Sequence, residues 1–275
     1  MLHPPTMPQL EDLISLALAA GREIMAVRAA GIDAQVKADG SLVTIADQRA
    51  EAIIEAGLAE LDAGVPMLGE EAVAAGRIPD CGARFYCVDP LDGTRGFANG
   101  GDEFTVNIAL VENATPVVGV VYAPATGELY AGQPSKALAG KCHPQTGKLL
   151  APMAAIAPGA FAQQPRVVAS DYSGRNERTG DFIAALNGVI THASSSIKFC
   201  RVAEGAADLY PRFGDVSEWD AAAGHAILKA AGGDIMLLDG SPLRYGGRNG
   251  DFLIHGFVAY GNATAKAAAL QALTR

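Results

Sequence analysis

The sequence predicts a layered α/β sandwich, with helices and sheets in both halves of the chain. Three observations support this class. Two stretches near the N-terminus have helical apolar spacing, and residues 85–132 contain short runs rich in β-branched and aromatic residues. Beyond residue 165, strand-like and helix-like segments alternate. Helix and sheet layers that recur along one chain favour a layered α/β (α+β) architecture.

The first half is predicted to begin with two helices. Residues 8–29 have helical apolar spacing that stops near Gly31, and residues 45–61 do the same behind an N-cap at Thr44. The runs FYCVD, FTVNIALV, PVVGVVYAP and GELYAG follow, with turn-forming residues between them. We therefore expect an antiparallel sheet after the helical pair.

The second half is predicted to alternate. Residues 139–165 are rich in Ala, Pro, Gly and Gln, and we expect them to connect two lobes, 1–150 and 151–275. The expected elements are, in order, a strand in RVVAS, a helix at 175–187, a strand in GVITH, a helix near 196–205, a strand at 207–212, a helix at 219–231, strands at 234–238 and 252–260, and a final helix.

Composition excludes several classes of function. Of the 275 residues, 49% are apolar and 19% charged, which suits a substantial buried core. The net charge of −9, without a basic stripe, argues against a nucleic-acid polymer as partner, whereas a small anionic substrate is compatible if bound cations reverse the local field. Four cysteines without a C-x-x-C pair predict reduced thiols in a cytoplasmic protein. We expect no signal peptide and no transmembrane segment.

The most informative segment is D-P-L-D-G-T, residues 89–94, which follows an apolar strand. Pro90 has no N–H to offer a neighbouring strand and helps to end this one, and Gly93 permits a tight turn. Asp89, Asp92 and the Leu91 carbonyl can then converge on one point, and such oxygen ligands suit a hard cation such as Mg²⁺. The alternative is an ordinary Asp-Pro and Asp-Gly turn.

Other segments carry weaker signals of their own. G-E-E at 69–71 also suits the solvated start of a helix. W-D at 219–220 opens an Ala-rich helix in which Asp can cap free N–H groups, and T-I-A-D at 44–47 has the form of a capping box. A rival chemistry uses a covalent aspartyl-phosphate and the motif D-x-D-G-T near the N-terminus. It fits poorly, because the spacing here is one residue longer and the motif begins at residue 89.

Taken together, G-E-E, D-P-L-D-G-T and W-D-x-A-A-G, in this order and at these separations, resemble the inositol monophosphatase superfamily. Within it, the chain is most similar to the bacterial 3′(2′),5′-bisphosphate nucleotidase branch. The resemblance runs from about residue 8 to 258 and implies an αβαβα sandwich of the inositol monophosphatase and sugar phosphatase type. Further matching stretches are KADGSLVTIAD (37–47), DEFTVNIAL (102–110), VVGVVYAP (117–124), SSIKFCRVAEG (195–205), LYPRFG (209–214) and WDAAAGHAILKAAGG (219–233).

The resemblance implies roles for individual residues. Two or three Mg²⁺ ions are expected per site, held by Glu70, Asp89, Asp92, Asp220 and the main-chain oxygen of Leu91. Asp47 and Thr94 match the pair that orients the attacking water. One Mg²⁺ would lower the pKa of that water, the Thr94 hydroxyl held by Asp47 would accept or relay its proton, and a second Mg²⁺ would stabilise the leaving oxygen. No phosphoenzyme is implied.

The nucleotidase branch also implies a substrate site. Its substrate-contacting positions match Ser195, Ser196, Lys198 and Arg212, and Gly93-Thr94 should begin a helix whose N–H groups face the phosphate. A cation and hydroxyls suit a second, 5′ phosphate, although Lys198 on a solvated helix face is the alternative. The implied reaction converts adenosine 3′,5′-bisphosphate to AMP and phosphate, which removes a by-product of sulfate assimilation. Inhibition by lithium is implied too.

Two departures bear on the substrate. Many relatives have Ser-x-Ser-His after the strand, whereas this chain has Ser-Asp-Tyr-Ser at 170–173, and Lys-Glu-Phe is replaced by Arg-Gly-Phe at 95–97. An inositol-1-phosphate or sugar-phosphate phosphatase therefore stays open, as does a catalytically silent homologue, which the intact set of acidic residues disfavours. The resemblance allows a monomer or a homodimer. It also allows peripheral attachment to the inner membrane in place of a purely cytoplasmic location.

Overall fold

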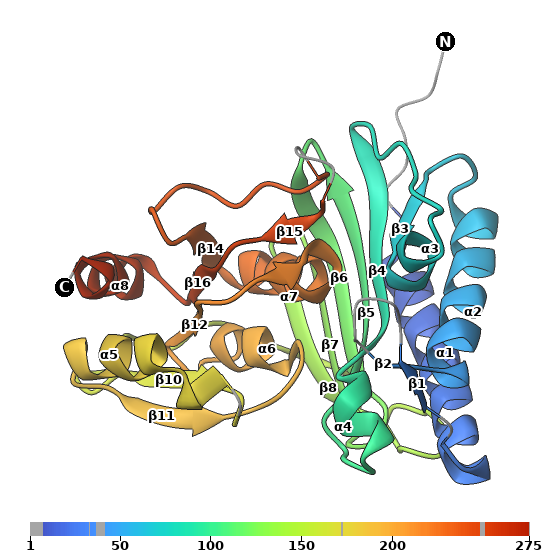
Figure 1. Cartoon of the computed structure of the whole chain (residues 1–275), viewed down its shortest axis with the longest axis horizontal. Coiled ribbons are helices and arrows are strands. Elements are labelled where there is room, and N and C mark those ends of the chain that lie inside the picture. Colours follow the sequence, from blue (N-terminus) through green and yellow to red (C-terminus); the bar gives the residue numbers. More distant parts are fainter. Residues whose placement is uncertain (1–7, 33, 37–41, 172, 248–250, 275) are drawn as a thin grey trace.

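The structure is a computed structural model that describes residues 8–32, 34–36, 42–171, 173–247 and 251–274. It is built from five layers, helix, sheet, helix, sheet and helix, which follow one another across the long axis in Figure 1. The αβαβα sandwich expected from the sequence is confirmed.

The first layer consists of α1 (Leu10–Ala30) and α2 (Ile45–Leu61), which pack on each other and on one face of the large sheet. Both match the predicted helices to within two residues. Thr44 caps α2 as predicted, and its hydroxyl accepts the N–H of Ala46 at 3.1 Å. A short hairpin, β1 (Ala34–Val36) and β2 (Leu42–Thr44), precedes α2.

The second layer is a seven-stranded sheet in the order β3-β4-β5-β6-β7-β8-β9. Only the β3–β4 pair is parallel; the rest of the sheet is antiparallel, as expected. Its strands are β3 (Met67–Gly69), β4 (Arg84–Asp92), β5 (Thr105–Glu112), β6 (Thr115–Ala123), β7 (Glu128–Gln133), β8 (Lys136–Lys141) and β9 (Ala154–Ala155). Two short helices, α3 (Glu70–Ala74) and α4 (Thr94–Ala98), lie between its first strands.

The prediction that 139–165 only connects two lobes was partly wrong. The stretch begins inside β8 and contains β9, so its first part extends the large sheet. It was missed because these residues are small and their burial does not alternate regularly. The chain passes from one sheet to the next between residues 155 and 166. The division into lobes 1–150 and 151–275 stays a prediction.

The fourth layer is a five-stranded sheet in the order β11-β10-β12-β16-β14. Its strands are β10 (Arg166–Ala169), β11 (Val189–His192), β12 (Leu209–Arg212), β14 (Asp234–Leu237) and β16 (Phe257–Tyr260). Its outer face carries α5 (Glu177–Ala185) and α8 (Ala263–Leu273), and a 3₁₀ turn, η1 (Ser173–Arg175), precedes α5.

The predicted strand at 252–260 is in fact two strands in different sheets. Gly256 has a φ of 90°, which turns the chain between β15 (Leu253–Ile254) and β16. β15 pairs with β13 (Val216–Ser217) instead of joining the five-stranded sheet. A local apolar run cannot reveal this change of sheet, because both halves of the run have strand-like residues.

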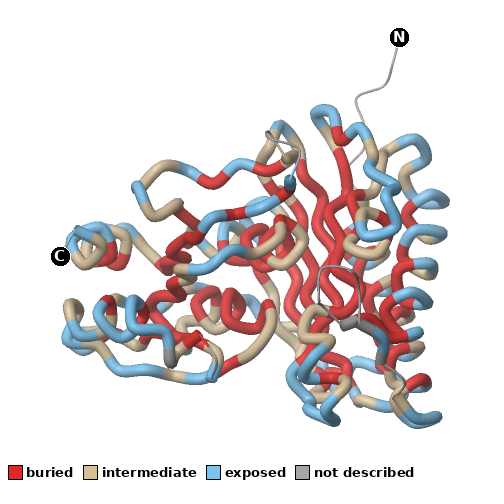
Figure 2. The backbone as a smooth tube through the Cα atoms, viewed as in Figure 1, coloured by how far each residue is buried: buried red, intermediate tan, exposed pale blue. Residues whose placement is uncertain are grey.

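The middle layer consists of α6 (Ile197–Ala203) and α7 (Glu218–Ala231), buried between the two sheets (Figure 2). α7 crosses the large sheet where two of its strands have glycine. A Cβ atom at Gly119 would lie 2.4 Å from the main-chain oxygen of Ala223, and one at Gly132 would lie 2.7 Å from the Cα of Ile227. Glycine therefore allows α7 to sit directly on the sheet.

Within the described residues, no helix combines the length and apolar character needed to span a bilayer. All four cysteines are buried and unpaired, as the sequence predicted.

Candidate metal centre

The centre begins where β4 stops pairing regularly with β5. Asp89 lies opposite Asn107, pairing then lapses, and it resumes where Asp92 lies opposite Thr105. Pro90 occupies this irregularity, so the strand kinks at the proline and does not end there. The Leu91 N–H donates to Asp89 Oδ1 at 2.9 Å, which fixes that carboxylate.

Asp220 reaches the same point from α7. It is the third residue of the helix, and its Oδ2 accepts the N–H of Ser217 at 2.9 Å. One carboxylate oxygen from each of Asp89, Asp92 and Asp220 lies within 4.8 Å of the other two. The structure thus brings together three of the predicted metal ligands from elements far apart in the sequence.

The three carboxyl groups are costly to ionise together. Burial raises the pKa of Asp89 well above its usual range, and the charges of Glu70, Asp92 and Asp220 raise it further. Burial and the charge of Asp92 raise the pKa of Asp220 to about 7. Burial also raises the pKa of Asp92, although the Lys198 charge opposes the shift. An all-oxygen donor set with this much negative charge fits a hard divalent cation such as Mg²⁺.

Glu70 lies beside this cluster because β3 runs parallel to β4, with Gly69 level with Val88. It is the first residue of α3, directly after the strand. Its charge acts on both Asp89 and Asp220. This position is compatible with the predicted fourth carboxylate ligand, whose role stays a prediction.

Asp47 and Thr94 form a direct pair. The Thr94 hydroxyl lies 3.0 Å from Asp47 Oδ1 and 3.0 Å from the main-chain oxygen of Leu91. Asp47 is buried, and its other oxygen accepts the N–H of Thr44 at 2.8 Å and the Thr44 hydroxyl at 2.7 Å. Burial raises the pKa of Asp47, and the bonds from Thr44 oppose that shift. Thr94 opens α4 after Gly93, which has a φ of 97° that favours glycine.

Ser195 and Ser196 use their hydroxyls within the protein. The Ser195 hydroxyl lies 3.0 Å from the main-chain oxygen of Asp92 and 3.1 Å from that of Glu103. The Ser196 hydroxyl lies 3.3 Å from Asp92 Oδ2 and 2.9 Å from the main-chain oxygen of Asp220. Ser195 adopts a φ of 51°, which is uncommon for a residue with a side chain. Through these hydrogen bonds the two residues connect the start of α6 to Asp92. Substrate contact by them stays a prediction.

Lys198 is buried, so the alternative of a solvated helix face was wrong. Its Nζ donates to the main-chain oxygen of Ser195 at 2.7 Å and lies 5.3 Å from the centre of the Tyr210 ring. Burial lowers its pKa to about 8. The neighbouring Arg212 donates to the main-chain oxygen of Asp215, while its buried Nε has no partner among the described residues.

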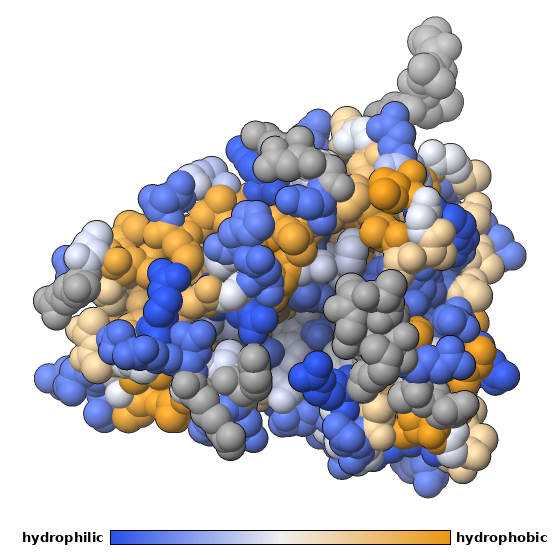
Figure 3. Space-filling view, viewed as in Figure 1, coloured by the Kyte–Doolittle hydropathy of each residue, from blue (hydrophilic) through white to orange (hydrophobic). Residues whose placement is uncertain are grey.

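Lys198, Arg212, Asp92 and Asp220 line one cleft of about 660 Å³. The cleft contains residues from both halves of the chain, including Gly93, Arg95, Ser170 and Ser195. Figure 3 shows a hollow between the two halves of the molecule, bordered mainly by hydrophilic side chains. Acidic and basic groups therefore face a single space.

Sequence reasoning missed two polar residues beneath the cluster. Asn107 and Thr105 lie on β5 opposite Asp89 and Asp92, and both are fully buried. Within the described chain the Thr105 hydroxyl has no hydrogen-bond partner, and the Asn107 side chain faces Asp92, where a hydrogen bond from Asn107 favours the charged form. Buried polar groups of this kind are rare outside functional sites. The available signal was the pair of polar residues, two positions apart, at the start of an otherwise apolar strand.

The model of the Inositol monophosphatase family matches residues 8–274. The chain belongs to the inositol monophosphatase family. The acidic cluster fits the metal-dependent phosphatase chemistry of this family.

Individual members of the family agree with this placement. The chain is 39% identical over 251 residues to the 3′(2′),5′-bisphosphate nucleotidase CysQ of Escherichia coli (strain K12), covering 90% of this chain and 98% of the relative. It is 40% identical over 250 residues to the CysQ nucleotidase of Salmonella typhimurium, with the same coverage. The crystal structure of CysQ from Bacteroides thetaiotaomicron superposes with a TM-score of 0.73 at 36% identity, covering 92% of this chain and 96% of that one. Thermotoga maritima IMPase has the same fold, with a TM-score of 0.73 at 22% identity.

The Ser-Asp-Tyr-Ser segment at 170–173 has no histidine of its own, and its two serine hydroxyls contact each other. Ser170 and Ser173 hydroxyls lie 2.8 Å apart. A histidine is nevertheless close, because His192 at the end of β11 lies 3.0 Å from the exposed Asp171. Tyr172 lies outside the described residues.

Proposed function

We propose that this protein is a Mg²⁺-dependent 3′(2′),5′-bisphosphate nucleotidase, which hydrolyses the 3′-phosphate of adenosine 3′,5′-bisphosphate to AMP and phosphate. The observation that carries the proposal is the shared cleft: the acidic cluster and two basic side chains, Lys198 and Arg212, face one space. Similarity to CysQ nucleotidases over most of the chain supports the same substrate class.

Glu70, Asp89, Asp92, Asp220 and the Leu91 carbonyl would hold two or three Mg²⁺ ions. When bound, Mg²⁺ supplies Lewis-acid chemistry, making a water more acidic and stabilising charge on the phosphate and the leaving oxygen. The chain's own part is to orient that water. Asp47 accepts a hydrogen bond from the Thr94 hydroxyl, which leaves a lone pair of the Thr94 oxygen directed to the water. As the Thr94 oxygen takes a proton from the water, the original Thr94 proton passes to the Asp47 carboxylate.

The two phosphates of the substrate are assigned to different ends of the cleft. The 3′-phosphate lies at the acidic cluster, with Gly93 and Thr94 at its edge, and the 5′-phosphate lies toward Arg212 and Lys198. A guanidinium with an unpartnered Nε–H suits a phosphate, because it can form charge-assisted hydrogen bonds with it. Ser195 lines the wall between the two ends, and the buried Ser196 lies behind it against Asp92.

A second candidate is an inositol-1-phosphate or sugar-phosphate phosphatase with the same centre. It is favoured by the Ser170–Ser173 turn, which lines the cleft at Ser170 with hydroxyls and no histidine. We further propose a cytoplasmic location, supported by four unpaired buried cysteines.

The test compares kcat/KM with Mg²⁺ for adenosine 3′,5′-bisphosphate, inositol 1-phosphate and fructose 1,6-bisphosphate. We expect at least about a hundredfold preference for the nucleotide, equivalent to roughly 2.7 kcal/mol of differential transition-state binding. A preference for either other substrate would replace the nucleotidase proposal with the second candidate. No hydrolysis of any of them would favour a catalytically silent homologue. LiCl, compared with NaCl, should inhibit the reaction.

A further inference from the structure

Glu51 is a buried carboxylate with no role so far. It lies on α2, four positions after Asp47 and on the same face of the helix. Only 2% of Glu51 is exposed, although glutamate is rarely buried to this degree without a partner. A buried carboxylate at this place needs a structural reason.

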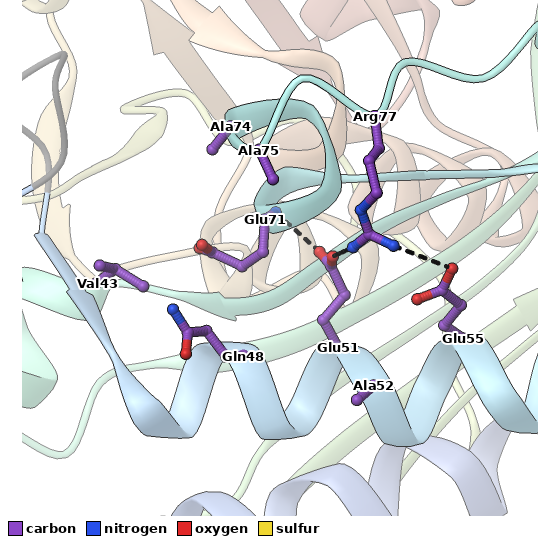
Figure 4. A pocket seen from close by; sticks show the side chains of 9 residues that line it. All are labelled: Val43, Gln48, Glu51, Ala52, Glu55, Glu71, Ala74, Ala75 and Arg77. Carbon is purple, nitrogen blue, oxygen red and sulfur yellow. Dashed lines mark hydrogen bonds and ion pairs between the residues drawn. The ribbon is translucent and has the colours of Figure 1, made fainter.

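Its partner is the start of α3. Glu51 Oε2 accepts the N–H of Glu71 at 2.8 Å (Figure 4). The N–H of Ala72 also favours the charged form of Glu51. The first N–H groups of a helix have no acceptor within the helix and carry partial positive charge. The residue at the N-cap, Gly69, has no side chain to satisfy them. Glu51 therefore caps α3 from a different helix.

The fit around this contact is tight. A Cβ atom at Gly69 would lie 2.7 Å from Glu51 Oε2, so glycine at 69 leaves room for the carboxylate. On the outer side, Arg77 lies 3.9 Å from Glu51 and 3.7 Å from Glu55, as Figure 4 shows. Glu51, Glu55 and Arg77 border a pocket of about 460 Å³ between α2 and α3.

The position of α3 matters because its first residue is Glu70. α3 has only five residues, and Glu71, whose N–H Glu51 holds, directly follows Glu70. We propose that Glu51 is a positioning residue, which sets where the Glu70 carboxylate meets the metal site. This inference rests on the proposed function, since it takes Glu70 as a Mg²⁺ ligand. α2 then serves the centre twice, through Asp47 and through Glu51.

The test measures Mg²⁺ binding by isothermal titration calorimetry to metal-free wild-type protein and to Glu51→Gln. Glutamine keeps the shape of the side chain and removes its charge. We expect the Kd for Mg²⁺ to rise about tenfold, the lower end of the range for partners that orient metal ligands. The loss of kcat at low Mg²⁺ should be recovered at high Mg²⁺. Glu55→Gln is the matched control, since it removes a charge beside Arg77 without touching α3, and its Kd should equal that of wild type.

Gly69→Ala tests the same contact from the other side, by pressing a methyl group on the Glu51 carboxylate, and it decides the matter if Glu51→Gln does not fold. An unchanged Mg²⁺ Kd in the folded variants, with only a lower Tm, overturns the positioning role and leaves Glu51 as a packing residue. If wild-type protein binds no Mg²⁺, the proposed function itself fails, and the positioning role fails with it.

Discussion

The carboxylates of Asp47 and Asp220 occupy equivalent places in their helices. Each is the third residue, and each accepts the N–H of the residue before the helix, from Thr44 at 2.8 Å and from Ser217 at 2.9 Å. One oxygen of each carboxylate is thereby used to fix the side chain, and in Asp47 the other oxygen accepts the Thr94 hydroxyl. Under the proposed function, the same groups would serve both capping and chemistry.

Thr44→Val should impair both the capping of α2 and the positioning of Asp47. It removes the hydroxyl that bonds Asp47 and caps α2, at a cost of about 1 kcal/mol in stability and roughly 2–4 °C in Tm. We also expect kcat to fall several-fold, because Asp47 loses one of its restraints. Asn176→Ala, which removes the cap of the remote α5, should lower Tm similarly and leave kcat unchanged. Equal kcat in the two variants would argue against coupling.

Asp92→Asn should abolish most turnover. Asp92 contributes to the carboxylate cluster and faces the cleft, so the change removes charge where Mg²⁺ is expected. Loss of a ligand should exceed the about 10–100-fold cost of losing an outer partner, in both Mg²⁺ affinity and kcat/KM. Asp181→Asn, at an exposed position on α5, supplies the control for charge alone. Near-normal activity of the first variant would refute the metal assignment.

Stability without metal should depend on pH in an unusual direction. Burial raises the pKa of Asp220 to about 7 and that of Asp89 well above its usual range, so these groups bind protons more tightly in the folded than in the unfolded state. Their contribution is therefore fully present below about pH 4 and is lost as pH rises toward and beyond 7.

Bound Mg²⁺ should offset that loss, because it stabilises the ionised carboxylates. We expect the increase in Tm from adding Mg²⁺ to EDTA-treated protein to be larger at pH 8 than at pH 5. Asp220→Asn should reduce the difference between the two pH values. An increase in Tm that does not vary with pH would show that Mg²⁺ binds elsewhere.

Arg212→Gln should separate substrates by their second phosphate. If Arg212 contacts the 5′-phosphate, its loss should raise KM for adenosine 3′,5′-bisphosphate by about 10–100-fold, as expected for a hydrogen bond to a charged group. KM for adenosine 3′-monophosphate, which lacks that phosphate, should change little. Equal effects on both substrates would point to a general role for Arg212 in the fold.

The elements that were predicted well have local signals. The apolar periodicity of 8–29 and the Thr44 cap gave correct helices, and the aspartates lie in short, distinctive motifs. The change of sheet at Gly256 and the additional strand β9 could not be predicted from the local sequence, because each depends on which sheet a short segment joins.

The hydrogen bonds between distant parts of the site could not be predicted from the sequence for the same reason. The bond from Ser196 to Asp92 spans 104 positions, and that from Glu51 to Glu71 spans 20. In the sequence, Glu51 is an ordinary glutamate on an amphipathic helix. Only the packing of α3 against α2 makes it a buried acceptor.

The glycines beneath α7 have a consequence for how the chain tolerates mutation. α7 carries Asp220 and the large sheet carries Asp89. The distance between these two carboxylates therefore depends on how closely α7 packs on the sheet. At Gly119 the absence of a side chain allows this close packing. An added methyl group would meet main-chain atoms of Ala223, which cannot rotate away. An alanine at position 119 is chemically inert and does not line the cleft. It would nevertheless push α7, and with it Asp220, away from Asp89.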